Sequence, residues 1–257
     1  MAETERTVTA CMIVIGNEIL SGRTQDANLT WIAGRLTELG IRLTEARVIP
    51  DVEATIVETV NAVRTRFDYV FTSGGIGPTH DDITADCIAK AFGVGIGIHP
   101  EARRRLEAHY AQQQGEFNEA RQRMARIPDG ATLIDNPISR APGFRIGNVF
   151  VMAGIPVVMR AMFESIRHEL VGGARLLSRT VSAFLPEGKF AAGLGQLQDR
   201  HPELDFGSYP FYRGGRAGAS IVVRGTNAAR LAAAVDEVKA LVGALGGEPL
   251  DGDPSAQ

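Results

Sequence analysis

A glycine-rich segment followed by two carboxylates has the residue types that a phosphate site requires. Residues 72–82 read TSGGIGPTHDD, with three glycines within four residues. Glycine lets the backbone adopt positive φ angles and approach a ligand closely, and the helix predicted next directs its free N–H groups toward the segment. Asp81 and Asp82 would repel a phosphate unless a cation lay between them or a proton neutralised one of them. The segment therefore predicts a phosphate site that includes a metal ion.

The glycine segment also has a simpler interpretation, which is a tight turn without a ligand. It is not a Walker P-loop, because no Gly-Lys-Ser/Thr follows, and it lacks the GxGxxG spacing of a dinucleotide fold. From the segment alone, both interpretations stay open. His80 lies within it and is the one histidine that we place near a phosphate.

Further acids follow other predicted strands. Asp51 comes after a strand predicted at 41–49, and Glu18, beside Asn17, comes after the first strand of the chain. From the residues alone, a helix cap is the favoured interpretation of Asp51 and an alternative for Asp82, while Glu18 could be a solvated loop acid. Because ligands bind at the carboxyl ends of strands in open α/β sheets, the two aspartates could instead share a divalent cation.

Other catalytic motifs are missing from the sequence. It contains no HExxH, CxxC or GxSxG pattern, and its five histidines show no short zinc-ligand spacing. Cys11 lies in an apolar run and Cys87 in a helical pattern. We therefore predict that both are buried free thiols in a reducing compartment.

Alternating strands and helices position the candidate residues. The unbroken apolar run at 8–15 predicts a strand buried on both faces, and the alternating pattern at 41–49 predicts a strand near an edge. Further strands are predicted at 67–71 and 149–152. Helices are predicted to begin near Asp26, Asp51, Ile83 and Val157. This order indicates a doubly wound, mostly parallel sheet.

Two polar stretches interrupt this pattern. Arginine and glutamate side chains mix through a helical stretch at 99–126, for which a solvated helix face is the main interpretation and a ligand or subunit contact is the alternative. Residues 127–147 are rich in Pro, Gly and Asn, which predicts a loop with short extended pieces.

A second, smaller domain is predicted after a hinge at Gly172 and Gly173. Residues 173–257 show the order strand, helix, strand, strand, helix, which indicates an α+β domain, with a disordered tail after Gly246. The first domain is then 1–172, a three-layer α/β/α unit.

Composition excludes several classes of protein. The 257 residues are 44% hydrophobic and 22% charged, with a net charge of −3, as in a soluble globular protein without a general attraction to nucleic acid or anionic membrane. The first residues do not form a signal peptide, and no apolar run is long enough to span a bilayer. We expect a cytoplasmic protein.

Three ordered motifs resemble the molybdopterin-binding (MoaB/Mog-type) domain in the version found in CinA-like competence/damage-inducible proteins. They are IGNEILSGRTQDAN at 15–28, TSGGIGPTHDDITAD at 72–86 and MAGIPVVMRAM at 152–162. The resemblance runs through residues 8–170. Residues 185–225 are similar to the segment that follows this domain in CinA-like proteins and in the molybdopterin-binding half of eukaryotic FAD synthases.

The resemblance implies roles for individual residues. Asp82 and Asp51 match acids that serve the family's active site and would hold the metal, Mg²⁺ or Co²⁺. The positions that would hold the phosphate or pterin end of the ligand are Ser73, Gly74, Gly75 and Gly77. Positions that match the family's first loop and late Gly-Pro turn are Asn17, Glu18, Gly154 and Pro156.

The same resemblance implies a function. We expect binding of a pterin phosphate or nucleotide diphosphate, with metal-dependent hydrolysis of the diphosphate in ADP-ribose or FAD. The alternatives are a non-catalytic molybdopterin- or nucleotide-binding protein and a molybdopterin adenylyltransferase of molybdenum cofactor biosynthesis, against which the small domain counts. A homo-oligomer is expected because relatives assemble. Longer members carry an amidohydrolase domain that this sequence lacks, so deamidation is not expected.

Overall fold

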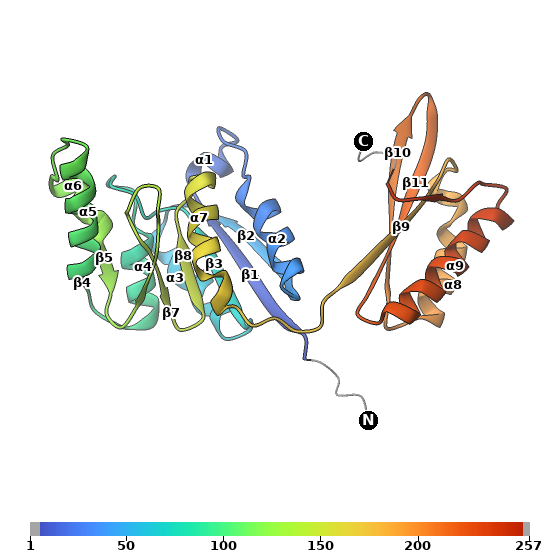
Figure 1. Ribbon diagram of the computed structural model, residues 1–257, viewed down its shortest axis with the longest axis horizontal. Helices are drawn as coiled ribbons and strands as arrows, with labels where there is room; N and C mark the ends of the chain where they lie inside the picture. The colour runs from blue at the N-terminus through green and yellow to red at the C-terminus, as the bar shows by residue number, and fades with distance from the viewer. Residues whose placement is uncertain (1–5, 254–257) are drawn as a thin grey trace. The chain divides into compact units, whose positions relative to one another are not determined.

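The computed structural model describes residues 6–253 and divides into two structural units (Figure 1). The first unit ends at Gly173 and the second begins at Ala174. Both glycines of the predicted hinge belong to the first unit. A Cβ on Gly172 would lie 1.6 Å from the Leu39 carbonyl oxygen, and the Gly173 N–H donates to the Gly40 carbonyl at 3.1 Å. These glycines therefore allow a close backbone contact directly before the boundary between the two units, and their role as a hinge stays a prediction.

Six strands of the first unit form one sheet in the order β2-β1-β3-β8-β7-β6 (Figure 1). In this order they are Ile41–Ile49, Val8–Ile15, Tyr69–Ser73, Val149–Met152, Gly143–Ile146 and Thr132–Ile134. The first four strands are parallel, whereas β7 pairs antiparallel with both β8 and β6. The mostly parallel sheet and the edge position of β2 are as predicted.

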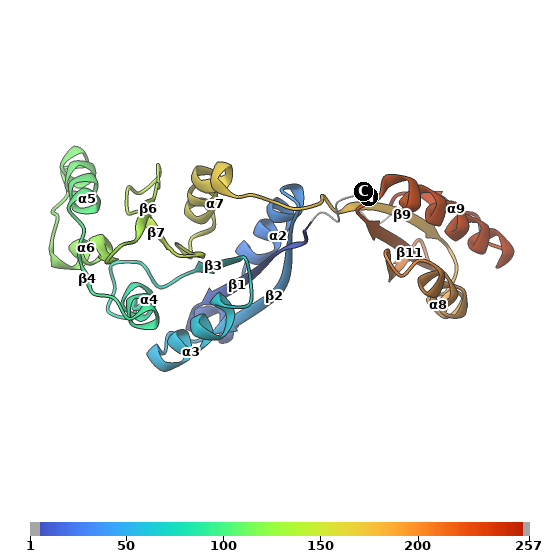
Figure 2. The ribbon, with the colours of Figure 1, turned by 90° about the horizontal axis from the view of Figure 1, so that it is seen from below.

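Helices cover both faces of this sheet, which gives the predicted three layers. They are α2 (Asn28–Glu38) and α7 (Pro156–Ile166) on one face, and α3 (Glu53–Arg64) and α4 (Thr84–Phe92) on the other (Figure 2). Successive residues of β1 alternate between two hydrophobic cores: Met12 and Val14 pack beneath α2 and α7, and Ile13 and Ile15 beneath α3 and α4. Burial on both faces explains why β1 is almost wholly apolar.

Two segments of the first unit differ from the prediction. β3 extends to Ser73, so Thr72 and Ser73 are buried strand residues. The helical stretch at 99–126 is not continuous, because Gln114 has a left-handed φ of 53° and separates α5 (Pro100–Gln112) from later turns. Those turns are α6 (Glu119–Gln122) and the 3₁₀ helix η1 (Arg123–Ala125), and they lead into β5 (Arg126–Pro128), which pairs with β4 (Ile96–Ile98). The short strands β5, β6 and β7 are the extended pieces predicted for residues 127–147.

Two short elements complete the first unit. They are α1 (Asn17–Leu20), directly after β1, and the 3₁₀ helix η2 (Arg167–Glu169), directly after α7.

Cys11 and Cys87 are buried free thiols, as predicted. Burial, followed by the nearby carboxylate of Glu45 for Cys11 and of Glu53 for Cys87, raises the pKa of each thiol to about 11. Neither thiol is a reactive nucleophile at neutral pH.

The second unit is an antiparallel sheet packed against helices. Its sheet has the order β10-β11-β9-β12, and Gly214 and Gly215, with φ of 58° and 77°, form the β10–β11 turn. Its elements are β9 (Leu177–Ala183), η3 (Glu187–Lys189), α8 (Ala191–Arg200), β10 (Asp205–Arg213), β11 (Arg216–Gly225), α9 (Ala228–Ala244) and β12 (Leu250–Asp251). The prediction of a disordered tail after Gly246 is wrong at β12, which pairs with β9; residues 254–257 lie outside the described part of the chain.

In residues 6–253, every helix is too short or too polar to cross a lipid bilayer.

Candidate functional site

The loops that follow β1, β2, β3 and β8 meet at the carboxyl edge of the first unit's sheet. The Gly16 N–H donates to the Ile49 carbonyl at the end of β2 (3.1 Å), and the Gly74 N–H donates to the Met152 carbonyl at the end of β8 (3.1 Å). A Cβ on Gly154 would lie 3.3 Å from the Gly74 Cα. Segments far apart in the sequence therefore form one continuous edge.

The glycines that follow β3 are required by contacts within the protein. Gly74 and Gly75 have φ of 108° and 68°, and an added Cβ would lie 2.1 Å from the Ile15 carbonyl oxygen or 2.1 Å from the Thr84 hydroxyl, respectively. The Thr84 hydroxyl and N–H donate to the Gly74 and Gly75 carbonyls at 3.0 and 2.9 Å. Close packing on β1 and α4 thus explains these glycines, and their contact with a phosphate stays a prediction.

Asp82 is held within its own loop. Its Oδ2 accepts from the Thr79 N–H at 2.8 Å and from the Thr79 hydroxyl at 2.5 Å, and a Cβ on Gly77 would lie 2.6 Å from that oxygen. The N-cap of α4 is Ile83, without a side-chain capping bond. The capping interpretation of Asp82 is therefore wrong. Asp81 is the residue before Asp82. Hydrogen bonds from the Thr79 hydroxyl and then from the N–H of Asp81 itself lower the pKa of the Asp81 carboxyl.

Asp51 joins two loops. Its Oδ2 accepts from the Asn17 N–H at 2.8 Å, while the N-cap of α3 is Val52, again without a side-chain capping bond. The favoured sequence interpretation of Asp51 as a cap of α3 is wrong, since its carboxylate instead stabilises the start of α1. Glu18 folds back on the same loop, because a Cβ on Gly16 would lie 2.5 Å from the Glu18 Oε1.

Buried polar side chains lie at the same edge. The Asn28 side-chain N–H donates to the Gly154 carbonyl at 2.7 Å, in the turn that precedes Pro156 at the start of α7. Asn28 and Ser73 are only 3% and 2% exposed, and the Asn28 Oδ1 and the Ser73 Oγ have no hydrogen-bond partner among the described residues. A buried polar atom without a partner costs about 1 to 3 kcal/mol. Such atoms are suited to a bound water or ligand. No local sequence pattern distinguishes Asn28 as a site residue.

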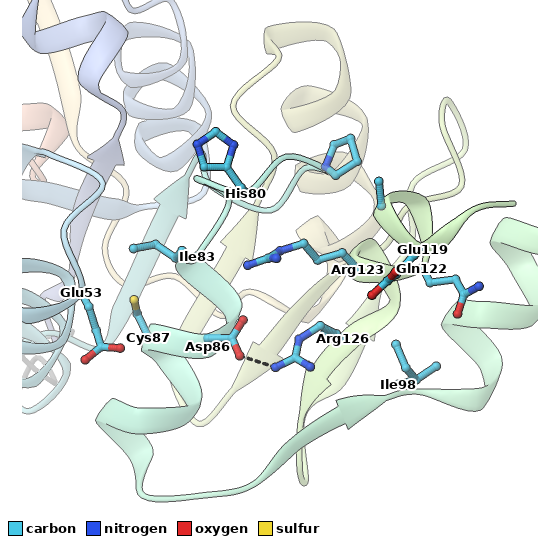
Figure 3. Close-up of a pocket in the computed structure, with 12 residues that line it drawn as sticks. Glu53, His80, Ile83, Asp86, Cys87, Ile98, Glu119, Gln122, Arg123 and Arg126 are labelled. Carbon is cyan, nitrogen blue, oxygen red and sulfur yellow. Dashed lines mark hydrogen bonds and ion pairs between the residues drawn. The ribbon is translucent and has the colours of Figure 1, made fainter.

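A cleft of about 890 Å³ lies between α4, with the loop that precedes it, and the α6–η1 segment (Figure 3). One wall carries His80, Ile83 and Asp86, and the opposite wall carries Arg123 and Arg126. An ion pair between Arg126 and Asp86 crosses it. The remaining lining residues are Glu53, Pro78, Cys87, Ile98, Glu119, Ala120 and Gln122.

A small hollow of about 10 Å³ lies between this cleft and the glycine loop. Gly77 and Asp82 line the hollow together with Asp86, Arg123 and Arg126, and these last three residues also line the cleft. For the stretch that includes these two arginines, a solvated helix face is the main sequence interpretation and a ligand or subunit contact is the alternative. The structure places both arginines in the lining of the cleft and of the hollow that Asp82 also lines, so the main interpretation is wrong for them and the ligand contact stays a prediction.

The two candidate metal ligands have different partners, since Asp51 accepts from Asn17 and Asp82 from Thr79. Within residues 6–253, no three Asp, Glu, His or Cys side chains are grouped closely enough to hold a metal ion. Mg²⁺ is commonly bound by one or two carboxylates together with substrate phosphates and water. The acids present fit that kind of site, in which the ligand supplies the other oxygens.

Comparison with known proteins identifies the first unit. Residues 11–172 match the family described as probable molybdopterin binding domain. The chain belongs to this family. Residues 175–245 match the middle domain of FAD synthase. The glycine loop, Asp51, Asp82 and the Gly154 turn all fall within the molybdopterin-binding domain, as the resemblance implied.

The relatives of this molybdopterin-binding domain protein include CinA-like proteins. A CinA-like protein of Geobacter sp. is 38% identical over 157 residues, which are 60% of this chain and 38% of the relative. A protein of Pyrobaculum calidifontis is 34% identical over 211 residues, 79% of this chain and 80% of the relative. The crystal structure of CinA, a protein of unknown function from Thermoplasma acidophilum, is 31% identical, with a TM-score of 0.59, over 63% of this chain and 99% of that chain. The CinA-like resemblance is confirmed.

Proposed function

We propose that the chain binds a pterin phosphate or a nucleotide diphosphate at the carboxyl edge of its first sheet and hydrolyses the diphosphate with a divalent metal. The observation that supports catalysis is the placement of the two acids. Asp51 and Asp82 each lie in a loop at this edge, and neither caps the helix that follows it. The interpretation of the two carboxylates as caps of α3 and α4 is thereby removed.

The two acids have different roles in the proposed hydrolysis. Asp82 is the general base: its Oδ2 is engaged by Thr79, and it lines the hollow beside the cleft. The carboxylate takes a proton from water, the water oxygen bonds to one phosphorus atom, and the bridging P–O bond breaks with its electron pair leaving on the other phosphate. Asp51 positions the first loop through the Asn17 N–H. Asp51 and Asp82 would hold Mg²⁺ or Co²⁺ together with oxygens of the ligand, and the ion would neutralise phosphate charge and lower the pKa of the attacking water.

One observation favours a second candidate, a binding protein without catalysis. The described residues contain no preformed group of three metal ligands, so the apo site has no metal centre of its own. A protein that only binds molybdopterin or a nucleotide needs none.

Incubation with ADP-ribose and Mg²⁺ or Co²⁺, followed by chromatography of AMP, tests the proposal. Loss of a general base lowers a rate about 100-fold to 10,000-fold, so Asp82→Asn should lose AMP release to that extent. Asp199→Asn, which changes an exposed acid of α8, is the matched control and should retain the rate. Equal rates in the two variants would remove Asp82 from catalysis. Binding without turnover, measured by calorimetry and unchanged by a chelator, would favour the second candidate.

A further inference from the structure

Arg123 differs from the arginines of the neighbouring helix α5. Arg103 pairs with Glu107 (2.7 Å), and Arg104 and Arg105 both pair with Glu101 (2.7 Å each). These pairs lie along one solvated helix face. The Arg123 Nε, in contrast, is buried and has no hydrogen-bond partner among the described residues.

The position of Arg123 is equally specific. It is the first residue of η1, and its side chain extends from that element across the cleft toward the wall that carries Ile83 and Asp86 (Figure 3). It lines both the cleft and the small hollow that Gly77 and Asp82 also line. A group that this guanidinium binds in the cleft therefore lies at the side of the cleft that is next to the hollow lined by Asp82.

The charges around Arg123 favour an anion. Asp86 is already paired with Arg126, and Glu53 is paired with Lys90, so two of the cleft's acids are balanced within the protein. Glu119, at the start of α6, is the remaining acid of the lining. A guanidinium fork binds phosphate oxygens bidentately, and a buried charged donor without a partner is costly. A phosphoryl group at the Arg123 end of the cleft would satisfy it.

The cleft also suits the organic part of such a ligand. Its volume of about 890 Å³ is in the range of small-molecule sites, which usually combine apolar walls with a few polar groups. Ile83, Ile98 and Pro78 give apolar surface, and Gln122 supplies both a donor and an acceptor. A nucleoside is large enough to pack against these apolar walls, and its polar groups can hydrogen-bond with Gln122.

We propose that Arg123 binds a phosphoryl group of a nucleoside diphosphate, and that the cleft between α4 and the α6–η1 segment holds the nucleoside. This inference rests on the proposed function for the role of Asp82. It selects the nucleotide over the pterin as the ligand class of the site, and it adds a phosphate-binding residue from an element that lies outside the strand-end loops. Arg126, tied to Asp86, supports the wall.

Calorimetric titration with α,β-methylene-ADP tests the inference, because this diphosphate cannot be hydrolysed at its bridge. Loss of one charge-assisted contact weakens binding on the order of tenfold to hundredfold, so Arg123→Gln should raise Kd by that factor in the presence of Mg²⁺. Arg123→Lys, which keeps the charge and loses the fork, should fall between. Arg103→Gln removes an equal charge from α5, outside the cleft, and should bind as the wild type does. Circular dichroism and a thermal melt establish that each variant is folded.

The outcomes separate the inference from the proposed function. Equal affinity in Arg123→Gln and Arg103→Gln, or no binding by the wild type, would overturn the inference, whatever the rate of ADP-ribose hydrolysis. A loss of affinity confined to the Arg123 variants supports it. If the Arg123 variants lost affinity but the wild type released no AMP from ADP-ribose, the nucleotide-binding inference would be supported and the proposed hydrolysis would be contradicted.

Discussion

Substitution of Gly74 by alanine should destabilise the first unit far more than the same change at an unconstrained glycine. Gly74 has a φ of 108°, and its added Cβ would lie 2.1 Å from the Ile15 carbonyl oxygen. The backbone strain costs about 1 to 3 kcal/mol, and inserting a methyl group into a closely packed site costs about 1 to 3 kcal/mol more. The oxygen belongs to the backbone of β1, so it cannot move aside without separating β1 from β3. The expected loss is about 2 to 6 kcal/mol.

Gly22→Ala is the matched control for this experiment. Gly22 also has a positive φ of 72°, but its added Cβ meets no described atom within 4 Å, so only the backbone strain of about 1 to 3 kcal/mol applies. Differential scanning calorimetry measures both variants. For a unit of this size, 1 kcal/mol shifts the Tm by about 2 to 4 °C, so the Tm of the first unit should fall on the order of 10 °C in Gly74→Ala. The transition of the second unit should not move.

Equal Tm shifts in Gly74→Ala and Gly22→Ala would refute the reasoning, because the contact between Gly74 and the Ile15 carbonyl would then contribute nothing. A shift of the second unit's transition instead would mean that the substitution acts outside the sheet edge.

Two further predictions concern titratable groups. Hydrogen bonds from Arg104 and then Arg105 lower the pKa of Glu101 to about 2. Because the folded pKa lies below the unfolded one, the stabilisation is present above about pH 4.5 and is lost as the pH falls toward 2. NMR titration should show that the pKa of Glu101 rises toward its ordinary value in Arg104→Ala. Burial raises the pKa of Cys11 and Cys87 to about 11, so a thiol reagent at pH 8 should label neither in the native protein and both after denaturation, and rapid native labelling would contradict their burial.

Local patterns were sufficient for the central strands and insufficient for the later ones. β1 could be predicted because burial on both faces leaves an apolar run that needs no other context. β6 and β7 have only three and four residues, too few to show an alternation. They are strands because β8 pairs with β7 and β7 with β6, and that pairing is not encoded locally.

The candidate acids illustrate the same limit. Asp51 and Asp82 have the residue type of a helix cap, and each stands just before a helix. Their hydrogen bonds nevertheless go elsewhere, and the partner of Asp51 is Asn17, in a loop that only the β1–β2 pairing brings near. Arg123 was grouped with the arginines of α5 because a sequence cannot show that a left-handed residue, Gln114, ends that helix first. The position of the strand-end loops was predictable, and the individual contacts were not.

The pairing of β3 with β8 has a consequence for synthesis of the chain. β3 is a buried apolar strand whose outer neighbour, β8, begins only at Val149. Until that residue leaves the ribosome, the backbone N–H and C=O groups along one side of β3 have no partner, and such an edge recruits strands from other chains. The nascent protein is therefore most prone to aggregate between the completion of β3 and the arrival of β8, and a chaperone that covers this edge would protect it through that interval.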